Sequence, residues 1–229
     1  MCCCADETRS DSKTIPYPDG SILEGAAGAN RSFDVDNSPY FPVIDFYNKK
    51  SEGSLTILEK FKTIQQTTEF SCGPACVLMV LEHFGKYKGQ KDRDLYELRE
   101  NKKRKESMLK DMIHMFECNG EWDIFSTYDL DDPSDISKEM ILDSLKDNKP
   151  IIFGDNEWGG HWRIIIGYDD MGDNFEENDV LIIAEPYDTT NHHQDGYITV
   201  PFERLFYNWN NYFDPDFNKN LFLIASPKV

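Results

Sequence analysis

Residues 72–85 read CGPACVLMVLEHFG, and this stretch decides what fold the chain can adopt. Its apolar residues recur at mixed spacings of one, three and four positions, which predicts a helix that is buried on most sides. Proline is well tolerated in a first helical turn, so Pro74 indicates the start of the helix, and Gly85 indicates its end. We therefore predict a core helix with Cys72 at its N-terminus.

Cys72 stands where a helix favours a reactive thiolate. Free backbone N–H groups and the positive end of the helix dipole stabilise a thiolate over a thiol. The same N–H groups can face an oxyanion as it develops on a substrate carbonyl. Taken alone, a Cys-Gly-Pro helix start is more often structural than catalytic, so the interpretation depends on partners elsewhere in the chain.

The elements around this helix predict an α+β domain. Helical patterns at 92–118 and 136–148, with a strand candidate at 121–129, come first. Runs rich in β-branched residues follow at 149–155, 161–169 and 179–188, and a strand, a short helix and a last strand fill 198–229. Because helices precede strands, we expect an N-terminal helical layer that contains the Cys72 helix and packs on an antiparallel sheet.

The N-terminal part of the chain has a different composition. Residues 1–50 are rich in Ser, Asp, Asn, Gly and Pro and show no sustained period, which predicts a polar tail and an extended arm. Within it, SPYFPVIDFY (38–47) is apolar enough to pack on the domain. We place the domain itself at residues 51–229.

Four further residues are candidate partners for Cys72, and two of them compete for the same role. His161 follows Gly159-Gly160 at the start of the strand RIIIGY, and a sheet would hold its imidazole rigidly for a thiolate–imidazolium couple. A carboxylate must then fix the imidazole tautomer, and the next strand ends in two candidates, Glu185 and Asp188. Gln66, six residues before Cys72, could donate an amide N–H to the oxyanion.

Together these motifs resemble the bacteriocin-leader-processing (double-glycine) peptidases of the papain-like superfamily. The segment QTTEFSCGPAC (66–76), the helix that ends in HFG, and Gly160-His161 at a strand start carry the resemblance, which spans roughly residues 60–210. The stand-alone members without a transporter are the most similar. The resemblance implies a papain-like fold, with Cys72 as nucleophile, His161 as base and Gln66 beside the oxyanion.

The third catalytic position departs from that family. Its members end the second strand in Asp-Pro, and this chain has Glu185-Pro186. Glutamate is one methylene longer, so it can still reach His161 with adjusted geometry. We therefore favour Glu185 over Asp188, which lies three residues further into a loop. We also expect Trp158, Gly160 and Trp162, which flank His161, to shape the substrate groove, although packing explains the two tryptophans equally well.

Composition excludes several classes of function. With 24 Lys and Arg against 42 Asp and Glu, the net charge is −18, which disfavours nucleic-acid binding and electrostatic membrane binding. Apolar runs are too short to span a membrane. The six cysteines lack the spacing of a zinc site, and we expect neither a metal nor a cofactor.

Cysteine usage bears on the compartment. The spacing of the cysteines does not suggest a disulfide framework, which favours a reducing compartment such as the cytoplasm. Acylation of Cys2–Cys4 or a trimmed export signal remains an alternative.

The sequence therefore predicts a cysteine peptidase or amidohydrolase that acts on a peptide or protein substrate through a thioester at Cys72. Two alternatives stay open: a weakly active or inactive papain-like module that binds peptides or proteins, and an acyltransferase or deamidase on the same fold. Retention of Gln66, Cys72 and His161 together favours an enzyme, and the altered residue Glu185 favours the binding module.

Overall fold

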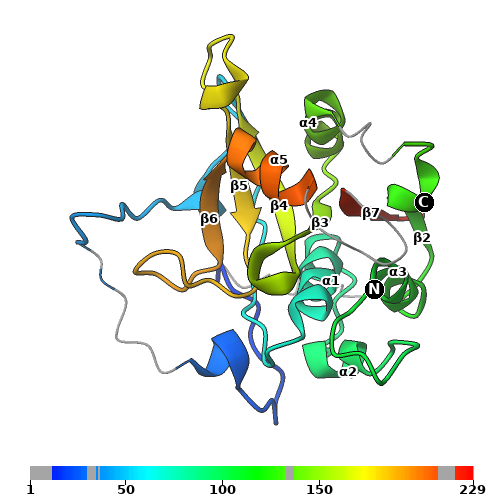
Figure 1. Cartoon of the computed structure of the whole chain (residues 1–229). Helices are drawn as coiled ribbons and strands as arrows, with labels where there is room; N and C mark the ends of the chain where they lie inside the picture. Colours follow the sequence, from blue (N-terminus) through cyan, green and yellow to red (C-terminus); the bar gives the residue numbers. More distant parts are fainter. Residues whose placement is uncertain (1–11, 30–34, 36, 133–136, 211–219, 229) are drawn as a thin grey trace, which may run out of the picture.

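Seven strands form one antiparallel sheet with helices packed against it (Figure 1). The computed structural model describes residues 12–29, 35, 37–132, 137–210 and 220–228. The order across the sheet is β2-β7-β3-β4-β5-β6, and β1 pairs with β4. The strands are β1 (Leu55–Ile57), β2 (Trp122–Ser126), β3 (Ile151–Asp155), β4 (His161–Asp169), β5 (Val180–Ala184), β6 (Tyr197–Pro201) and β7 (Leu221–Pro227).

The helices occupy the predicted segments. They are α1 (Cys72–His83), α2 (Asp92–Tyr96), α3 (Leu109–Glu117), α4 (Lys138–Lys146) and α5 (Phe202–Asn210). Helices α1, α2 and α3 lie together beside the sheet, and α1 packs on the central strand β4 (Figure 1). The predicted α+β class, with a helical layer on an antiparallel sheet, is confirmed. The short strand β1, which the sequence pattern did not reveal, pairs with the far half of β4.

Helix α1 runs through the core as its sequence predicts. Every residue from Ala75 to Leu81 is at most 1% exposed. The helix ends where Gly85 adopts φ +66°, a left-handed conformation that suits glycine, and Lys86 N–H then donates to the Leu81 carbonyl at 2.7 Å. A helix buried on this scale has little freedom to move, so the position of Cys72 at its N-terminus is fixed.

Strand register brings the start of β4 beside the end of β5. In the β4–β5 pair, Ile164 faces Ala184, and on the other side of β4 His161 faces Asp155 of β3. Continuing the β4–β5 register by one residue sets Glu185 opposite Arg163. Residues two apart on a strand share a face, so His161, Arg163, Asp155 and Glu185 gather at one end of the sheet.

The described part of the N-terminal arm is bonded to the domain. Thr14 forms a parallel bridge with Thr63, Ile15 is 2% exposed, and Ala27 N–H donates to the Gln66 carbonyl at 3.0 Å. Within the predicted tail and extended arm, residues 13–27 thus follow the surface of the domain. Of the 38–47 segment, Phe46 and Tyr47 belong to the hydrophobic core, whereas Tyr40 and Val43 are exposed. Cys2–Cys4, the residues proposed for acylation, lie outside the described part.

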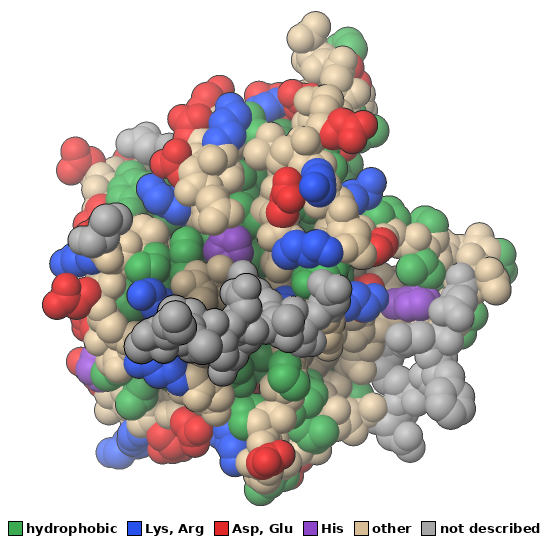
Figure 2. All heavy atoms as spheres, turned by 180° about the vertical axis from the view of Figure 1, so that it is seen from behind, with side chains coloured by type: hydrophobic (Ala, Val, Ile, Leu, Met, Phe, Trp, Pro, Cys, Tyr) green, Lys and Arg blue, Asp and Glu red, His purple; other side chains and the backbone are tan. Residues whose placement is uncertain are grey.

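Charged side chains are spread over the surface. On the face shown in Figure 2, Asp and Glu side chains stand around the edge, and Lys and Arg side chains lie among them. None of the helices in the described ranges is both long enough and apolar enough to cross a bilayer.

Candidate active site

A buried carboxylate fastens the loop that presents Cys72. Asp92, at the start of α2 and 3% exposed, accepts hydrogen bonds from Thr67 N–H, Thr67 Oγ1 and Ser71 Oγ, each at 2.7 Å. The loop between Gln66 and Cys72 is thereby tied at both ends. Cys72 itself is partly exposed at the N-terminus of α1, where its thiol meets the open space of a pocket.

Tight packing explains the glycine after Cys72. A Cβ atom on Gly73 would lie 2.5 Å from Met112 Sδ and 3.3 Å from Trp162 Cδ1. Trp162 is 3% exposed, and its indole N–H donates to the Ser107 carbonyl at 2.8 Å. The expectation that Trp162 lines the substrate groove is therefore wrong. It follows His161 on a strand, so it points to the opposite face and supports the start of α1.

His161 joins Cys72 to a carboxylate. Its Nε2 lies 2.5 Å from Glu185 Oε1, and its ring lines the same pocket as Cys72. Because Nε2 faces Glu185, Nδ1 is the ring nitrogen that is left to face the sulfur. The structure thus brings the three side chains together in one row, and it places Glu185 rather than Asp188 against the imidazole.

The charges in this row favour the imidazolium form of His161. Burial by itself lowers the pKa of His161, but the Glu185 charge and the hydrogen bonds to Cys72 and Glu185 outweigh it, so the pKa lies well above its ordinary value. Burial likewise raises the pKa of Glu185, whereas the charges of His161 and Arg163 lower it more strongly, to about 2. An imidazolium beside Cys72 is the partner that a reactive thiolate requires.

Glu185 is held from four directions. It is 0% exposed, and its Oε1 also accepts from Tyr187 N–H at 2.8 Å. Arg163 Nε forms an ion pair with Oε2. Gln65 Nε2 donates to the Glu185 carbonyl at 2.9 Å. A carboxylate with these partners keeps one orientation toward His161.

Asp188, the other candidate, serves the loop that follows β5. It accepts from Gly196 N–H at 3.0 Å and from Thr190 Oγ1 at 3.0 Å, and its own N–H donates to Gln65 Oε1 at 2.8 Å. Burial raises the pKa of Asp188 to about 6, although the hydrogen bonds from Gly196 and Thr190 oppose that shift. Its carboxylate therefore organises a turn and does not contact the imidazole.

This shift predicts a pH-dependent stability. Unfolded Asp titrates near 3.9, so between about pH 4 and pH 6 the folded chain binds more protons at Asp188 than the unfolded chain does. The contribution of Asp188 to the free energy of unfolding is therefore fully present below the pKa of the unfolded chain. This contribution is lost as the pH rises through 6. Relative to Asp188→Asn, the wild-type free energy of unfolding should fall by roughly 2–3 kcal/mol between pH 4 and pH 7 in urea titrations. A pH-independent difference between the two proteins would contradict the assignment.

Gln66 lies beside Cys72 in the same pocket. It is 1% exposed, its backbone N–H donates to the Pro186 carbonyl at 2.8 Å, and its Nε2 donates to the Thr68 carbonyl at 2.7 Å. An amide Nε2 carries two hydrogens, so one remains for a substrate oxygen. The Glu185-Pro186 segment that places a carboxylate against His161 thus also anchors Gln66.

The pocket around Cys72 has a volume of about 600 Å³. Its walls are Gln66, Glu69, Phe70, Cys72, Glu106, Trp158, Gly159, Gly160, His161 and Tyr187. Trp158, on the short turn η5 (Glu157–Gly159), is 61% exposed and stacks edge-on against His161 at 5.2 Å and against Tyr187 at 5.4 Å. Gly160 has φ +132°, which gives the chain a sharp bend just before His161.

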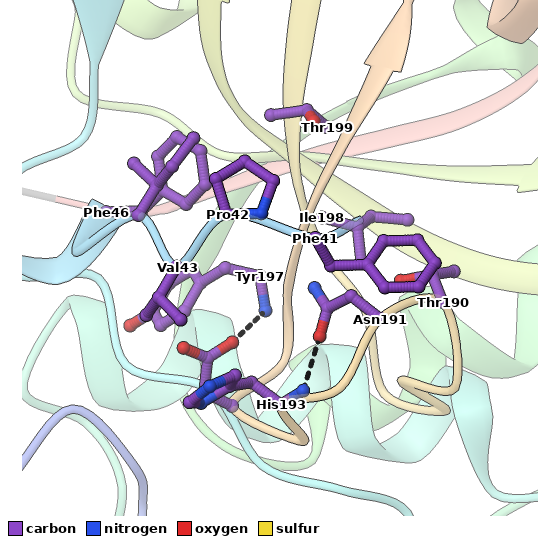
Figure 3. A pocket seen from close by; sticks show the side chains of 12 residues that line it. Phe41, Pro42, Val43, Phe46, Thr190, Asn191, His193, Tyr197, Ile198 and Thr199 are labelled. Atoms are coloured by element: carbon purple, nitrogen blue, oxygen red, sulfur yellow. Dashed lines mark hydrogen bonds between the residues drawn. The ribbon is translucent and has the colours of Figure 1, made fainter. Parts of the chain in front are cut away.

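A second pocket lies at the edge strand β6 and shares no lining residue with the first (Figure 3). Phe41, Pro42 and Val43 of the arm cover one side of it, and the loop that contains Asn191 and His193 covers another. Its dashed bonds run from Tyr197 N–H to Asp195 Oδ1 at 3.2 Å and from His193 N–H to Asn191 Oδ1 at 2.6 Å. Both contacts lie within the loop and the start of β6.

Sequence reasoning missed the side chains that hold the site in place. Arg163, Asp155, Asp92 and Gln65 were not among the predicted residues. A signal existed for Arg163, because an arginine two positions after His161 lies on the same strand face inside an apolar run. No group of three or more His, Cys, Asp or Glu residues with the arrangement of a metal site occurs in the described ranges.

Comparisons with known proteins identify the fold and the family. Comparison with curated proteins returned no significant match. Among solved structures, a Bacillus anthracis protein described as a C39-like peptidase shares the fold, with a TM-score of 0.52 and 13% sequence identity over 76% of this chain and 98% of that chain. The model of the Peptidase C39-like family matches residues 58–214, which include the helix α1 and the strands β4 and β5. The chain therefore belongs to the Peptidase C39-like family.

Proposed function

We propose that the chain is a cysteine peptidase or amidohydrolase in which Cys72, His161 and Glu185 form the catalytic triad. The observation that carries this proposal is the position of His161, which lines one pocket with Cys72 and contacts a fully buried carboxylate through Nε2. A papain-like module that only binds peptides has no physical need for this charged row, which costs free energy to bury.

The proposed reaction proceeds in two steps. The Cys72 thiolate attacks the substrate carbonyl carbon, the carbon–nitrogen bond breaks, and the His161 imidazolium gives its Nδ1 proton to the leaving amine. A water molecule then attacks the thioester while His161 takes a proton from it, which releases the carboxylic acid and restores the thiol. Glu185 keeps the second proton of the imidazole on Nε2 throughout. The backbone N–H of Cys72 and the free hydrogen of Gln66 Nε2 face the oxyanion.

Other lining residues are proposed to bind substrate. Trp158 and Gly160 form one wall beside His161. Glu69 and Glu106 also line the pocket, and with the net charge of −18 they favour positively charged peptide substrates.

Selective modification of Cys72 tests the proposal without knowledge of the substrate. The protein is treated with iodoacetamide at pH 6, and adducts are located by peptide mapping with mass spectrometry. We expect Cys72 to react about 10- to 100-fold faster than an ordinary thiol, because a cysteine beside a protonated imidazole at a helix N-terminus is in the setting of a reactive nucleophile. Burial raises the pKa of Cys76 well above its ordinary value, so Cys76 should stay unmodified.

A matched variant removes the main ambiguity. Cys118 is exposed, and its sulfur lies 3.5 Å from His114 Nε2, so it is the other described cysteine that could react early. The measurement is therefore repeated in Cys118→Ser. Fast modification that persists there and maps to Cys72 supports an enzyme, whereas a slow, unselective reaction supports the binding module.

A further inference from the structure

One buried guanidinium contacts three carboxylates on three segments. Arg163 of β4 is 3% exposed. Its terminal nitrogens bond to Asp155 Oδ2 of β3 at 2.9 Å and pair with Glu157 of η5, while its Nε pairs with Glu185 after β5. Asp155 and Glu185 are both 0% exposed. Arg163 therefore connects β3, η5 and the segment after β5, which lie around His161.

The charge balance of this cluster depends on His161. Glu157 is partly exposed, so its charge is screened by water. The two fully buried carboxylates, Asp155 and Glu185, and the one buried guanidinium leave one negative charge uncompensated, and burying such a charge is costly. A protonated His161 supplies the missing positive charge. The cluster behind the triad thus favours the imidazolium state that the proposed chemistry uses.

The guanidinium also restricts the conformation of Glu185. A glutamate has one more rotatable bond than the aspartate of the resembling family and therefore more orientations to exclude. Arg163 pairs with Oε2 while His161 contacts Oε1, so each carboxylate oxygen is held by its own partner. A planar guanidinium with several donors suits this task better than the point charge of a lysine.

The same side chain holds the turn that carries Trp158. Asp155 Oδ1 accepts from Glu157 N–H at 3.0 Å, and the Glu157 carboxylate pairs with Arg163. Trp158 follows with φ +52°. This conformation costs free energy for a residue other than glycine, so it persists only where neighbouring contacts impose it. Its ring then rests against His161 and Tyr187.

We propose that Arg163 is a positioning residue, whose guanidinium orients Glu185 toward His161 and fixes the Trp158 turn against the imidazole. This inference rests on the proposed function, because it assigns Arg163 a role in the Cys72–His161–Glu185 triad.

The test uses a variant that keeps the charge balance but removes the guanidinium. Arg163→Gln alone would leave two buried carboxylates without their cation, so the informative protein is Asp155→Asn/Arg163→Gln, which loses one charge of each sign. A matched control is Lys138→Gln/Asp179→Asn. It removes a partly buried ion pair at the opposite end of the β4–β5 hairpin, in which the two charged groups are 2.7 Å apart and Asp179 is 1% exposed. Circular dichroism and urea unfolding establish that both variants fold.

We expect the folded Asp155→Asn/Arg163→Gln protein to alkylate at Cys72 about 10- to 100-fold more slowly than wild type at pH 6, because a misplaced catalytic group loses rate on this scale. The Lys138→Gln/Asp179→Asn control should react at the wild-type rate, and Arg163→Lys should show partial rescue. Iodide quenching of tryptophan fluorescence should increase in the Arg163→Gln double variant. Trp158 dominates that signal, since the other three tryptophans are at most 7% exposed.

A wild-type alkylation rate, or unchanged quenching, in the folded Arg163→Gln double variant would overturn the inference. The proposed function fails by a different result, namely that His161→Ala leaves the alkylation of Cys72 unchanged in the wild-type background. In that case the fluorescence measurement still decides whether Arg163 fixes the Trp158 turn.

Discussion

Replacing His161 by alanine is expected to slow the alkylation of Cys72 at pH 6 by about 100-fold. An ordinary thiol with a pKa near 8.5 holds only ~0.3% thiolate at that pH, and without its imidazolium partner Cys72 should react as such a thiol. Loss of the proton carrier should also lower kcat/KM for any cleaved peptide by about 10⁴-fold, at the upper end of what general acid–base groups contribute. The alkylation rate is measured by mass spectrometry over a series of quench times.

The variant is expected to fold, because Glu185 keeps its contacts with Arg163 and Tyr187 when the imidazole is removed. Circular dichroism and the urea midpoint check this. The rate at pH 9.5, where an ordinary thiol is ionised, serves as an internal control and should differ little between the two proteins. Equal rates at pH 6 would instead mean that the helix terminus alone, or nothing, activates Cys72.

Local sequence patterns were sufficient to predict the helix and the two strands that carry the site. The apolar spacing of residues 72–85 predicted α1, and the position of Pro74 predicted its start. The β-branched run after His161 predicted β4, and antiparallel pairing predicted that the end of β5 would lie beside it. These features depend on residues close together in sequence, where propensity and burial agree.

Strand alternation accounts for the error at Trp162. His161 and Trp162 are consecutive on one strand and so must face opposite sides, which puts Trp162 against Gly73 and away from the pocket. The same rule puts Arg163 on the face of His161. The positions of Trp162 and Arg163 could both have been predicted from the sequence, if the alternation of strand faces had been counted from His161.

Other contacts could not be predicted from local patterns. Asp92 reaches back 25 residues to Thr67, and Gln65 reaches forward 120 residues to the Glu185 carbonyl. Such side-chain hydrogen bonds depend on how the layers stack, and no periodicity encodes them. The three-residue strand β1 is a similar case, because its extended form is set by the neighbouring strand β4.

The choice of Glu185 over Asp188 leads to the second prediction. Glu185→Gln should lower kcat/KM by about 10²- to 10⁴-fold and slow alkylation of Cys72 at pH 6, whereas Asp188→Asn should leave both close to wild type. In the Gln variant, an uncharged amide replaces the carboxylate beside His161. The imidazole then loses the negative charge that raises its pKa, so the imidazolium form is less favoured.

The two variants form a matched pair, because each exchanges one buried carboxylate for an amide of nearly the same shape. Glu185→Gln is expected to fold, since Arg163 still pairs with Asp155 and Glu157. Urea unfolding of both proteins separates lost stability from lost chemistry. The ring nitrogens of His161, followed by NMR, should show an imidazolium in Asp188→Asn and a neutral ring in Glu185→Gln at pH 7. If Asp188→Asn lost the imidazolium and the alkylation rate while Glu185→Gln kept both, Asp188 would be the third member of the triad and the geometry around Glu185 would be structural.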